Sequence, residues 1–211
     1  TVVSYNGSHA YSITPATGYH VADVLVDNVS VGAVGVWRIM DIYERHGIKA
    51  TIGANGLAVE KWPETIRAFH KAGHEIASHG WRWIDYQDVP MEVEREHMRR
   101  AIDIHARLTG SRPLGWYTGR TSPNTFSLVV EEGGFLYSAD DYSDELPFYA
   151  RRAGKPQLVV PYTLDANDMR FTQVQGFNSG EQFFTYLRDT FDVLYAEGEH
   201  TPRMMSVGLH C

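Results

Sequence analysis

The sequence predicts an α/β fold in which a parallel sheet curves into a (β/α) barrel. Three observations predict it. Short apolar segments alternate with segments of helical spacing, polar residues follow the apolar segments at four places, and no Gly-rich dinucleotide-binding turn follows a strand. The alternation is typical of parallel sheets, and a chain without the dinucleotide turn favours a barrel over a Rossmann sheet.

The predicted strands are short apolar runs bounded by glycine or polar residues. The start of the chain is poorly patterned, so that either Val2–Tyr5 or Val21–Val26 could form the first strand. The later strands are expected at Ile48–Ile52, Glu75–Ser78, Leu114–Tyr117, Phe135–Ser138, Leu158–Pro161 and Met204–Leu209.

The predicted helices have apolar residues three and four positions apart. Gly47, Gly73, Gly110 and Gly133 stand where glycine caps the end of a helix, and Pro63 suits a first turn. The expected helices are Val36–Arg45, Pro63–Lys71, Pro90–Leu108, Phe126–Glu132 and Gly180–Ala196, the last with Phe183, Phe184, Leu187, Phe191 and Leu194 turned inward.

Composition and charge exclude two classes of partner. The net charge is −7 with dispersed Lys and Arg, which argues against nucleic acid and anionic membranes. No apolar run approaches the ~18 residues that span a bilayer. The single cysteine, Cys211, excludes an internal disulfide and predicts a reducing, cytoplasmic compartment. We expect residues 1–211 to form one catalytic domain of a chain that continues past Cys211 and whose start at Thr1 is processed or cut.

The segment Ser78–Trp83 is the most informative in the chain. It contains a histidine just past the end of a predicted strand, which is where α/β enzymes place catalytic groups. His79 is therefore a candidate acid/base residue, and Trp81 and Trp83 could wall a flat substrate. The alternatives are a structural histidine and two core tryptophans.

Three further polar clusters follow predicted strands. Arg120 could bind a carboxylate or orient a catalytic group, or it could form a structural ion pair. Asp165 and Asp168 could bind a polar ring or act as a base, or they could cap their loop. His210 again stands at the end of an apolar run. Because the carboxyl ends of barrel strands converge on one face, we expect these residues and His79 to form one site.

The segment Ala72–Gly80 resembles the second motif of the polysaccharide deacetylase (NodB-homology) family. The resemblance implies a distorted, incomplete (β/α) barrel. Metal-dependent members of that family bind zinc through an aspartate and two histidines spaced H-x-x-x-H. In this chain the first histidine of that spacing is His79, and the position of the second is occupied by Trp83. We therefore expect no catalytic metal, and keep a zinc-dependent N-deacetylase of polysaccharides or amino sugars as the alternative.

The chain more closely resembles the family's purine-degrading branch, the metal-independent allantoinases. Four stretches carry this resemblance: His79–Ile84, Pro113–Thr125, Leu158–Phe171 and Met204–Cys211. It implies hydrolysis of a cyclic amide C–N bond without a cofactor, either allantoin to allantoate or a related hydantoin or imide. For this reaction we expect His79 and His210 to act on protons or position water, and Arg120 to orient groups or stabilise charge. The expected substrate-binding residues are Trp81, Trp83, Tyr117, Asp165 and Asp168.

The resemblance breaks down at the start of the chain. Branch members carry an Asn-Tyr-Glu-Glu-Gly-like turn after the first strand, and the nearest match here, Val3–Ser8, lacks the acids. Asp27 is a candidate replacement. The missing acids leave open a third interpretation, a non-catalytic relative that binds a ring ligand or serves as a partner subunit. The branch forms homo-oligomers, so we also expect a homo-oligomer, up to a tetramer.

Overall fold

The computed structural model describes residues 25–26, 29–30 and 34–210. The chain divides into two units, residues 1–48 and residues 49–211. In the first unit, β1 (Leu25–Val26) pairs antiparallel with β2 (Val29–Ser30), and α1 (Val34–Arg45) follows. The helix predicted over Val36–Arg45 is therefore present. The prediction of one domain over residues 1–211 stays a prediction.

The second unit is built on a six-stranded sheet in the order β3-β4-β5-β6-β8-β7. The first five of these strands run parallel, and β7 pairs antiparallel with β8 at the edge. Among the described residues the sheet does not close, which confirms the α/β fold and its incomplete barrel. The strands are β3 (Thr51–Ala54), β4 (Glu75–Ser78), β5 (Gly115–Trp116), β6 (Tyr137–Ser138), β7 (Phe148–Arg152) and β8 (Lys155–Val159).

The strands predicted over Ile48–Ile52 and Leu158–Pro161 are shifted to Thr51–Ala54 and Lys155–Val159, and two larger differences stand beside these shifts. The β7–β8 hairpin was not predicted, because its two-residue turn begins with Ala153 rather than with Asn or Asp. Ala153 and Gly154 both have positive φ, as a type I′ turn requires. The strand predicted over Met204–Leu209 is wrong, since this segment makes only an isolated parallel bridge between Gly208 and Asn167.

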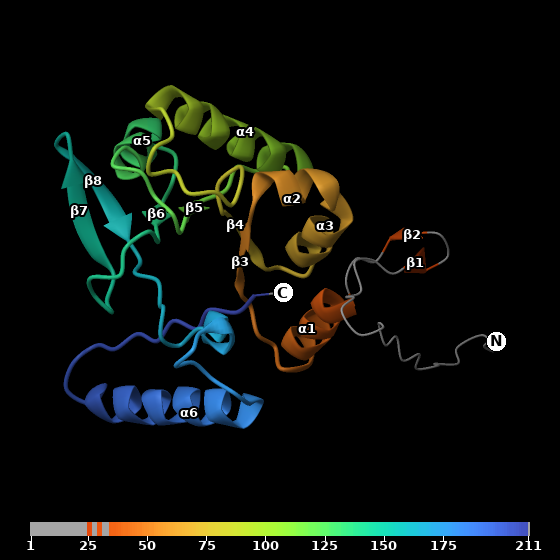
Figure 1. Cartoon of the computed structure of the whole chain (residues 1–211), viewed down its shortest axis with the longest axis vertical. Coiled ribbons are helices and arrows are strands. Elements are labelled where there is room, and N and C mark those ends of the chain that lie inside the picture. Colours follow the sequence, from red (N-terminus) through yellow and green to blue (C-terminus); the bar gives the residue numbers. More distant parts are fainter. Residues whose placement is uncertain (1–24, 27–28, 31–33, 211) are drawn as a thin grey trace. The chain divides into compact units, whose positions relative to one another are not determined.

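Four helices pack together along the sheet (Figure 1). Their packing buries a hydrophobic core whose aromatic members, Trp116 and Phe135, lie 5.2 Å apart between ring centroids. The other buried residues of this core are Met98, Ala101, Leu128 and Val129. The helices are α2 (Gly56–Lys61), α3 (Pro63–Lys71), α4 (Met91–Thr109) and α5 (Thr125–Glu132).

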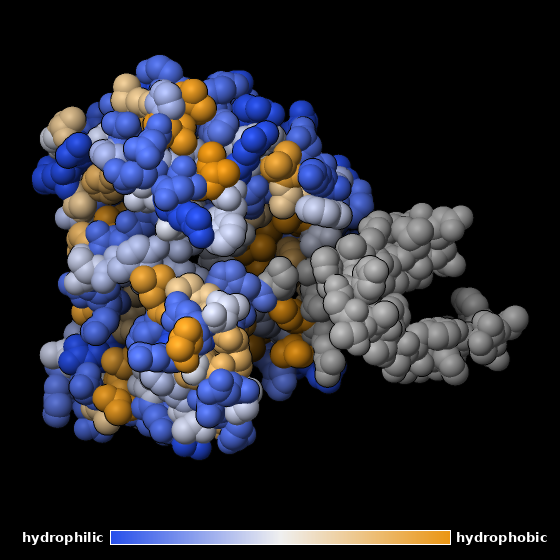
Figure 2. All heavy atoms as spheres, in the orientation of Figure 1, coloured by the Kyte–Doolittle hydropathy of each residue, from blue (hydrophilic) through white to orange (hydrophobic). Residues whose placement is uncertain are grey.

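The long helix α6 (Gly180–Glu197) follows a short 3-10 helix, η1 (Asp168–Thr172). No residue of α6 is buried, and Phe184 and Phe191 are 56% and 54% exposed. The prediction that these two side chains turn inward is therefore wrong. Figure 2 shows hydrophobic and hydrophilic surface alternating over this part of the molecule. No helix in the described part of the chain has the length and apolar character needed to cross a membrane.

Candidate active site

The site is built where the parallel strands end. Because parallel strands finish at the same edge of a sheet, residues that follow them come together although they are far apart in sequence. His79 follows β4, Tyr117 follows β5, Asp140 lies just beyond β6, and Tyr162 lies just beyond β8. The ring centroids of His79 and Tyr117 are 4.9 Å apart, and those of Tyr117 and Tyr162 are 4.6 Å apart.

The backbone holds His79 firmly in this position. Its N–H donates to the carbonyl of Ala54 at 3.0 Å, and its own carbonyl accepts from Nδ2 of Asn55 at 3.3 Å. The Nδ1 atom of the ring is buried, and no hydrogen-bond partner for it lies among residues 25–26, 29–30 and 34–210. Burial lowers the pKa of His79, and the nearby charge of His210 lowers it further. His79 is therefore a neutral imidazole near neutral pH.

The carboxylate of Asp168 is hydrogen-bonded to His210 at two points. One oxygen lies 2.6 Å from Nδ1 of the His210 ring, and the other accepts from the backbone N–H of His210 at 2.8 Å. A carboxylate only accepts, so the neutral imidazole carries its proton on Nδ1 and its lone pair on Nε2. This pairing fixes the tautomer and the orientation of the His210 ring.

A bridge between two short segments places the Asp168–His210 pair. The N–H of Asp168 donates to Gly208 at 3.0 Å, and the N–H of Gly208 donates to Ala166 at 2.9 Å. A Cβ at Gly208 would lie 2.3 Å from Nδ2 of Asn167, so only glycine fits there. Asn167 is fully buried, and its Nδ2 donates to Oη of Tyr162 at 3.1 Å. The bridge thus joins the Asp168–His210 pair to the aromatic side of the site.

Tyrosines form that aromatic side. The hydroxyls of Tyr117 and Tyr142 are 3.1 Å apart, and the Tyr142 ring lies 6.5 Å from that of Tyr162. Burial raises the pKa of all three phenols, most strongly that of Tyr117. They stay protonated at physiological pH, and can donate hydrogen bonds to a bound molecule.

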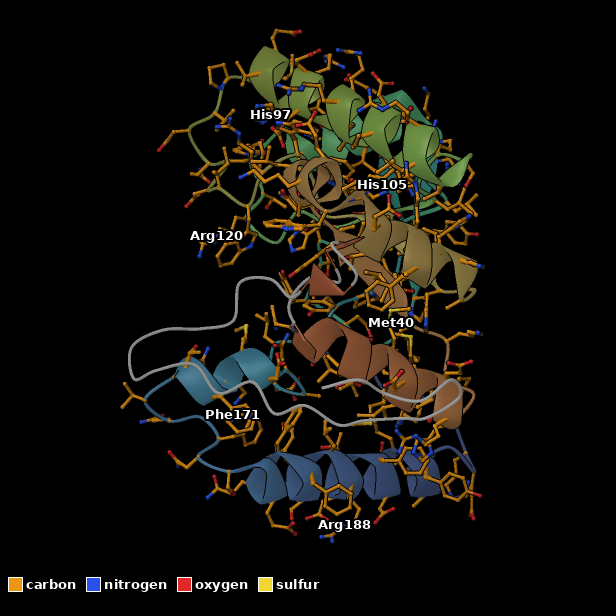
Figure 3. All side chains as sticks on the ribbon, turned by 90° about the vertical axis from the view of Figure 1, so that its right-hand side faces the viewer. Met40, His97, His105, Arg120, Phe171 and Arg188 are labelled. Atoms are coloured by element: carbon orange, nitrogen blue, oxygen red, sulfur yellow. The ribbon has the colours of Figure 1, made fainter. Side chains whose placement is uncertain are left out.

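Arg120 and Trp83 are in contact at the exposed surface, which is called the rim of the site below. The guanidinium carbon of Arg120 lies 4.5 Å from the Trp83 ring centroid, a cation–π arrangement. Figure 3 shows Arg120 at the outer surface of the molecule. Trp83 is 63% exposed. Trp81, by contrast, is 3% exposed and stacks under Arg100, so the structure places it in the core beneath the site.

Asp165 is hydrogen-bonded to side chains other than the two histidines. Its carboxylate accepts from the hydroxyls of Thr163 and Tyr186, the latter at 2.9 Å, and these bonds lower its pKa. It lines a hollow of about 620 Å³ that Tyr142 and Tyr162 also border. Of the predicted substrate-binding residues, Tyr117 and Asp168 contact the histidines, and Trp83 is exposed beside Arg120. Trp81 is buried, and Asp165 shares a hollow with Tyr142 and Tyr162.

Several site residues were not foreseen from the sequence. Tyr142 is among them, as is Asp140, whose carboxylate accepts from two backbone N–H groups after β5, whereas Tyr162 and Asn167 belong to the polar cluster predicted after the Leu158–Pro161 strand. A polar residue directly after each strand was the signal that could have found Asp140. The expectations for Val3–Ser8 and Asp27 fall outside the described residues.

The donors in the described part of the chain do not fit zinc. Zinc needs three protein ligands supplying nitrogen, sulfur or oxygen at about 2.0–2.3 Å. No group of three His, Cys, Asp or Glu side chains within the described residues could hold a metal ion. Trp83 has no ligand atom, and the Arg120 cation lies over its ring. Asp168 is already paired with His210.

The family model described as "Polysaccharide deacetylase" matches residues 21–132. A Schizosaccharomyces pombe protein named "Putative polysaccharide deacetylase" is 42% identical over 84% of this chain and 61% of its own length. The chain belongs to the polysaccharide deacetylase family. This confirms the predicted family, whose members are hydrolases of carbon–nitrogen bonds other than peptide bonds.

Two solved structures of this family resemble the chain closely. The crystal structure of PuuE allantoinase is 61% identical with a TM-score of 0.82, and covers 84% of this chain and 59% of its own. A "probable Polysaccharide deacetylase" from Pseudomonas aeruginosa PAO1 is 60% identical with a TM-score of 0.81, and covers 84% of this chain and 60% of its own. The polysaccharide deacetylase chain described here thus spans about three fifths of the length of each relative.

Proposed function

We propose that the protein hydrolyses a C–N bond of a small cyclic amide, allantoin to allantoate or a related hydantoin or imide. The observation that carries the proposal is the Asp168–His210 pair, whose imidazole is near enough to His79 to lower its pKa, because it offers a second imidazole with different partners to the same site. The 61% identity to the PuuE allantoinase structure supports the same reaction.

The chemistry needs a base, a proton donor and a group that stabilises an oxyanion. In the proposal, Nε2 of His210 takes a proton from water while the water oxygen bonds to the amide carbon. Asp168 stabilises the imidazolium that results. The ring C–N bond then breaks, and His210 returns the proton to the leaving nitrogen. Water thus supplies OH to the carbon and H to the nitrogen.

The remaining groups bind the substrate and the developing charge. His79 is proposed to position the water or to donate to the carbonyl oxygen, since burial keeps its ring neutral. Arg120 is proposed to stabilise the developing charge, and its guanidinium lies over the Trp83 ring. Tyr117 and Tyr162 offer ring faces that suit a flat heterocycle.

The test is turnover of allantoin by the purified protein, compared with His79→Ala and with His70→Ala. His70 lies exposed on α3 and serves as the matched control. We expect His79→Ala to lose about 100-fold or more in kcat and His70→Ala to keep wild-type activity. Wild-type activity in His79→Ala would remove His79 from the mechanism, and no turnover of any cyclic amide would end the proposal.

A second candidate function is N-deacetylation of a polysaccharide or amino sugar. The names of two relatives, the S. pombe protein and the P. aeruginosa structure, favour it. Release of acetate from N-acetylglucosamine oligomers, stoichiometric zinc by elemental analysis and inactivation by a chelator would place it first. Hydantoin binding by calorimetry without turnover would instead indicate a non-catalytic relative.

The assembly of the chain is likewise a proposal. A homo-oligomer, up to a tetramer, is expected, and α6 offers an apolar surface for it. Phe191 and Tyr195 stack there at 5.9 Å, with Tyr195 74% exposed. Light scattering that gives the mass of one chain would contradict the proposal.

A further inference from the structure

Asp140 occupies an unusual position just past the end of β6. Its Oδ1 and Oδ2 each accept from the N–H of Thr118 at 2.8 Å, and Oδ1 also accepts from the N–H of Gly119 at 2.7 Å. The ladder between β5 and β6 has just ended there, with the N–H of Ala139 donating to Trp116 at 2.8 Å. The carboxylate therefore continues the strand pairing beyond the last backbone carbonyl.

The turn that Asp140 holds carries residues of the site on both sides. Tyr117 precedes it, with its ring 4.9 Å from that of His79, and Arg120 follows it at the rim. Gly119 lies within it at φ 76°, a conformation that favours glycine.

A second contact from the same strand end reaches Tyr117. Tyr142, two residues after Asp140, places its hydroxyl 3.1 Å from that of Tyr117. The segment after β6 thus bonds the segment after β5 twice, through the backbone N–H groups of Thr118 and Gly119 and through the Tyr117 hydroxyl. The other side of the turn is tied to the core, where Nε1 of Trp116 donates to Oγ1 of Thr118 at 2.8 Å.

Keeping a carboxylate here is costly. Although the side chain is only partly buried, desolvation and the nearby buried carboxylate of Glu94 both disfavour its ionised form. A neutral side chain could cap one N–H group without that cost. A carboxylate is the only small side chain that offers acceptor oxygens to two neighbouring N–H groups without a donor of its own.

We propose that Asp140 is a positioning residue for the reaction: through the N–H groups of Thr118 and Gly119, it sets the turn that places Tyr117 against His79 and Arg120 at the rim. Only the activity assay that tests this inference rests on the proposed cyclic amide hydrolysis. Asp140 itself does not contact His79 and takes no part in proton transfer.

The test compares Asp140→Asn with Asp141→Asn, its neighbour. Within the described part of the chain the Asp141 side chain bonds Ser143 alone, and it serves as the control. Asparagine keeps the shape of Asp140 but must turn an NH2 group towards one of the two backbone donors. We expect kcat for allantoin to fall about 10- to 100-fold in Asp140→Asn, with KM changed much less. Asp141→Asn keeps wild-type values.

A second measurement needs no substrate. The Cε1–H resonance of His79, followed by NMR, reports the ring of Tyr117 beside it. We expect this resonance to move in Asp140→Asn and to stay in Asp141→Asn, while amide hydrogen exchange at Thr118 and Gly119 accelerates at least tenfold in Asp140→Asn only. A folded Asp140→Asn variant with unchanged exchange and an unmoved His79 signal would overturn the inference.

Two outcomes need to be kept apart. Should wild-type protein turn over no cyclic amide, the proposed function fails, and the NMR and exchange measurements still decide the role of Asp140. Should Asp140→Asn not fold, Asp140→Glu carries the test, because its longer side chain keeps the charge and displaces the turn. A folded Asp140→Glu variant with the wild-type His79 signal and exchange rates would then overturn the inference.

Discussion

Nδ1 of His210 lies 2.6 Å from one oxygen of Asp168, and the backbone N–H of His210 bonds the other oxygen at 2.8 Å. The ring is thereby fixed in both tautomer and orientation, although the His210 side chain is 59% exposed. A mobile surface imidazole would populate both tautomers and many orientations. The pair therefore gives a surface histidine the fixed geometry that acid/base catalysis requires.

Replacing Asp168 should release this histidine. In Asp168→Asn the side chain can turn its NH2 group towards Nδ1, which favours the tautomer with the proton on Nε2 and removes the base. We expect kcat for allantoin to fall about 100-fold or more in steady-state assays. Asp103→Asn, which removes only a surface ion pair with Arg99, is the control. Equal rates for the two variants would show that the pair is not part of the mechanism.

The pKa of His79 should depend on His210. Burial lowers the pKa of His79 first, and the charge of His210 adds to it. His210→Ala removes the second cause only, so the pKa of His79 should rise but remain below the ordinary value of about 6.5. Histidine NMR titration measures the shift, and His70→Ala should leave it unchanged. An unmoved titration in His210→Ala would mean that the two rings do not sense each other.

Gly119 and Gly154 form a matched pair for testing the turn after β5. Both have positive φ, at 76° and 79°, but a Cβ at Gly119 would lie 3.1 Å from the Tyr117 hydroxyl, whereas nothing lies within 4 Å at Gly154. Each alanine variant should lose about 1–2 kcal/mol of unfolding free energy in urea titrations. Only Gly119→Ala should also lose activity, because only there does the new methyl press on the site. Loss of activity in both would point to general destabilisation.

The raised pKa of Asp140 should make the free energy of unfolding fall as the pH rises. Desolvation raises its pKa to about 6, against about 3.9 for an unfolded aspartate. Between these values the folded state holds a proton that the unfolded state has lost. Its contribution to stability is therefore fully present below about pH 4, and is lost as the pH rises to about 6. The shift corresponds to about 3 kcal/mol.

Urea unfolding at several pH values measures this contribution. Asp140→Asn, which cannot titrate, should flatten the fall in unfolding free energy between pH 4 and 6, and Asp141→Asn should keep it. Identical slopes in wild type and Asp140→Asn would refute the raised pKa.

The local signals in the sequence predicted the helices better than the strands. The helix predicted at Pro63–Lys71 has those bounds, because proline at the start and glycine beyond the end act within a few residues. Gly110 and Gly133 likewise have the left-handed conformation expected of caps. The strand predicted over Met204–Leu209 failed, since an apolar run shows burial potential but not whether a neighbouring strand is there to pair with it.

For the site, the sequence predicted which strand ends carry its polar residues but not which of these residues contact one another. The Tyr117 ring lies 4.9 Å from the His79 ring, and His210 is near enough to lower the pKa of His79. The partner of His210 is Asp168 rather than Asp165, which bonds Tyr186 of α6 instead. Two aspartates three positions apart look equivalent in sequence, and only the bridge at Gly208 distinguishes them.

The hairpin at the edge of the sheet bears on how the protein behaves at high concentration. β6 pairs only with Leu158 and Val159 of β8, so the turn end of the β7–β8 ribbon extends past its parallel neighbour. An open strand edge is a template on which another chain can add a strand. The turn end of the ribbon carries three cations, Arg151, Arg152 and Lys155. Pro156 has no N–H group to donate. A second copy approaching here would set cation against cation, so the ribbon resists the self-templated growth that exposed sheet edges invite.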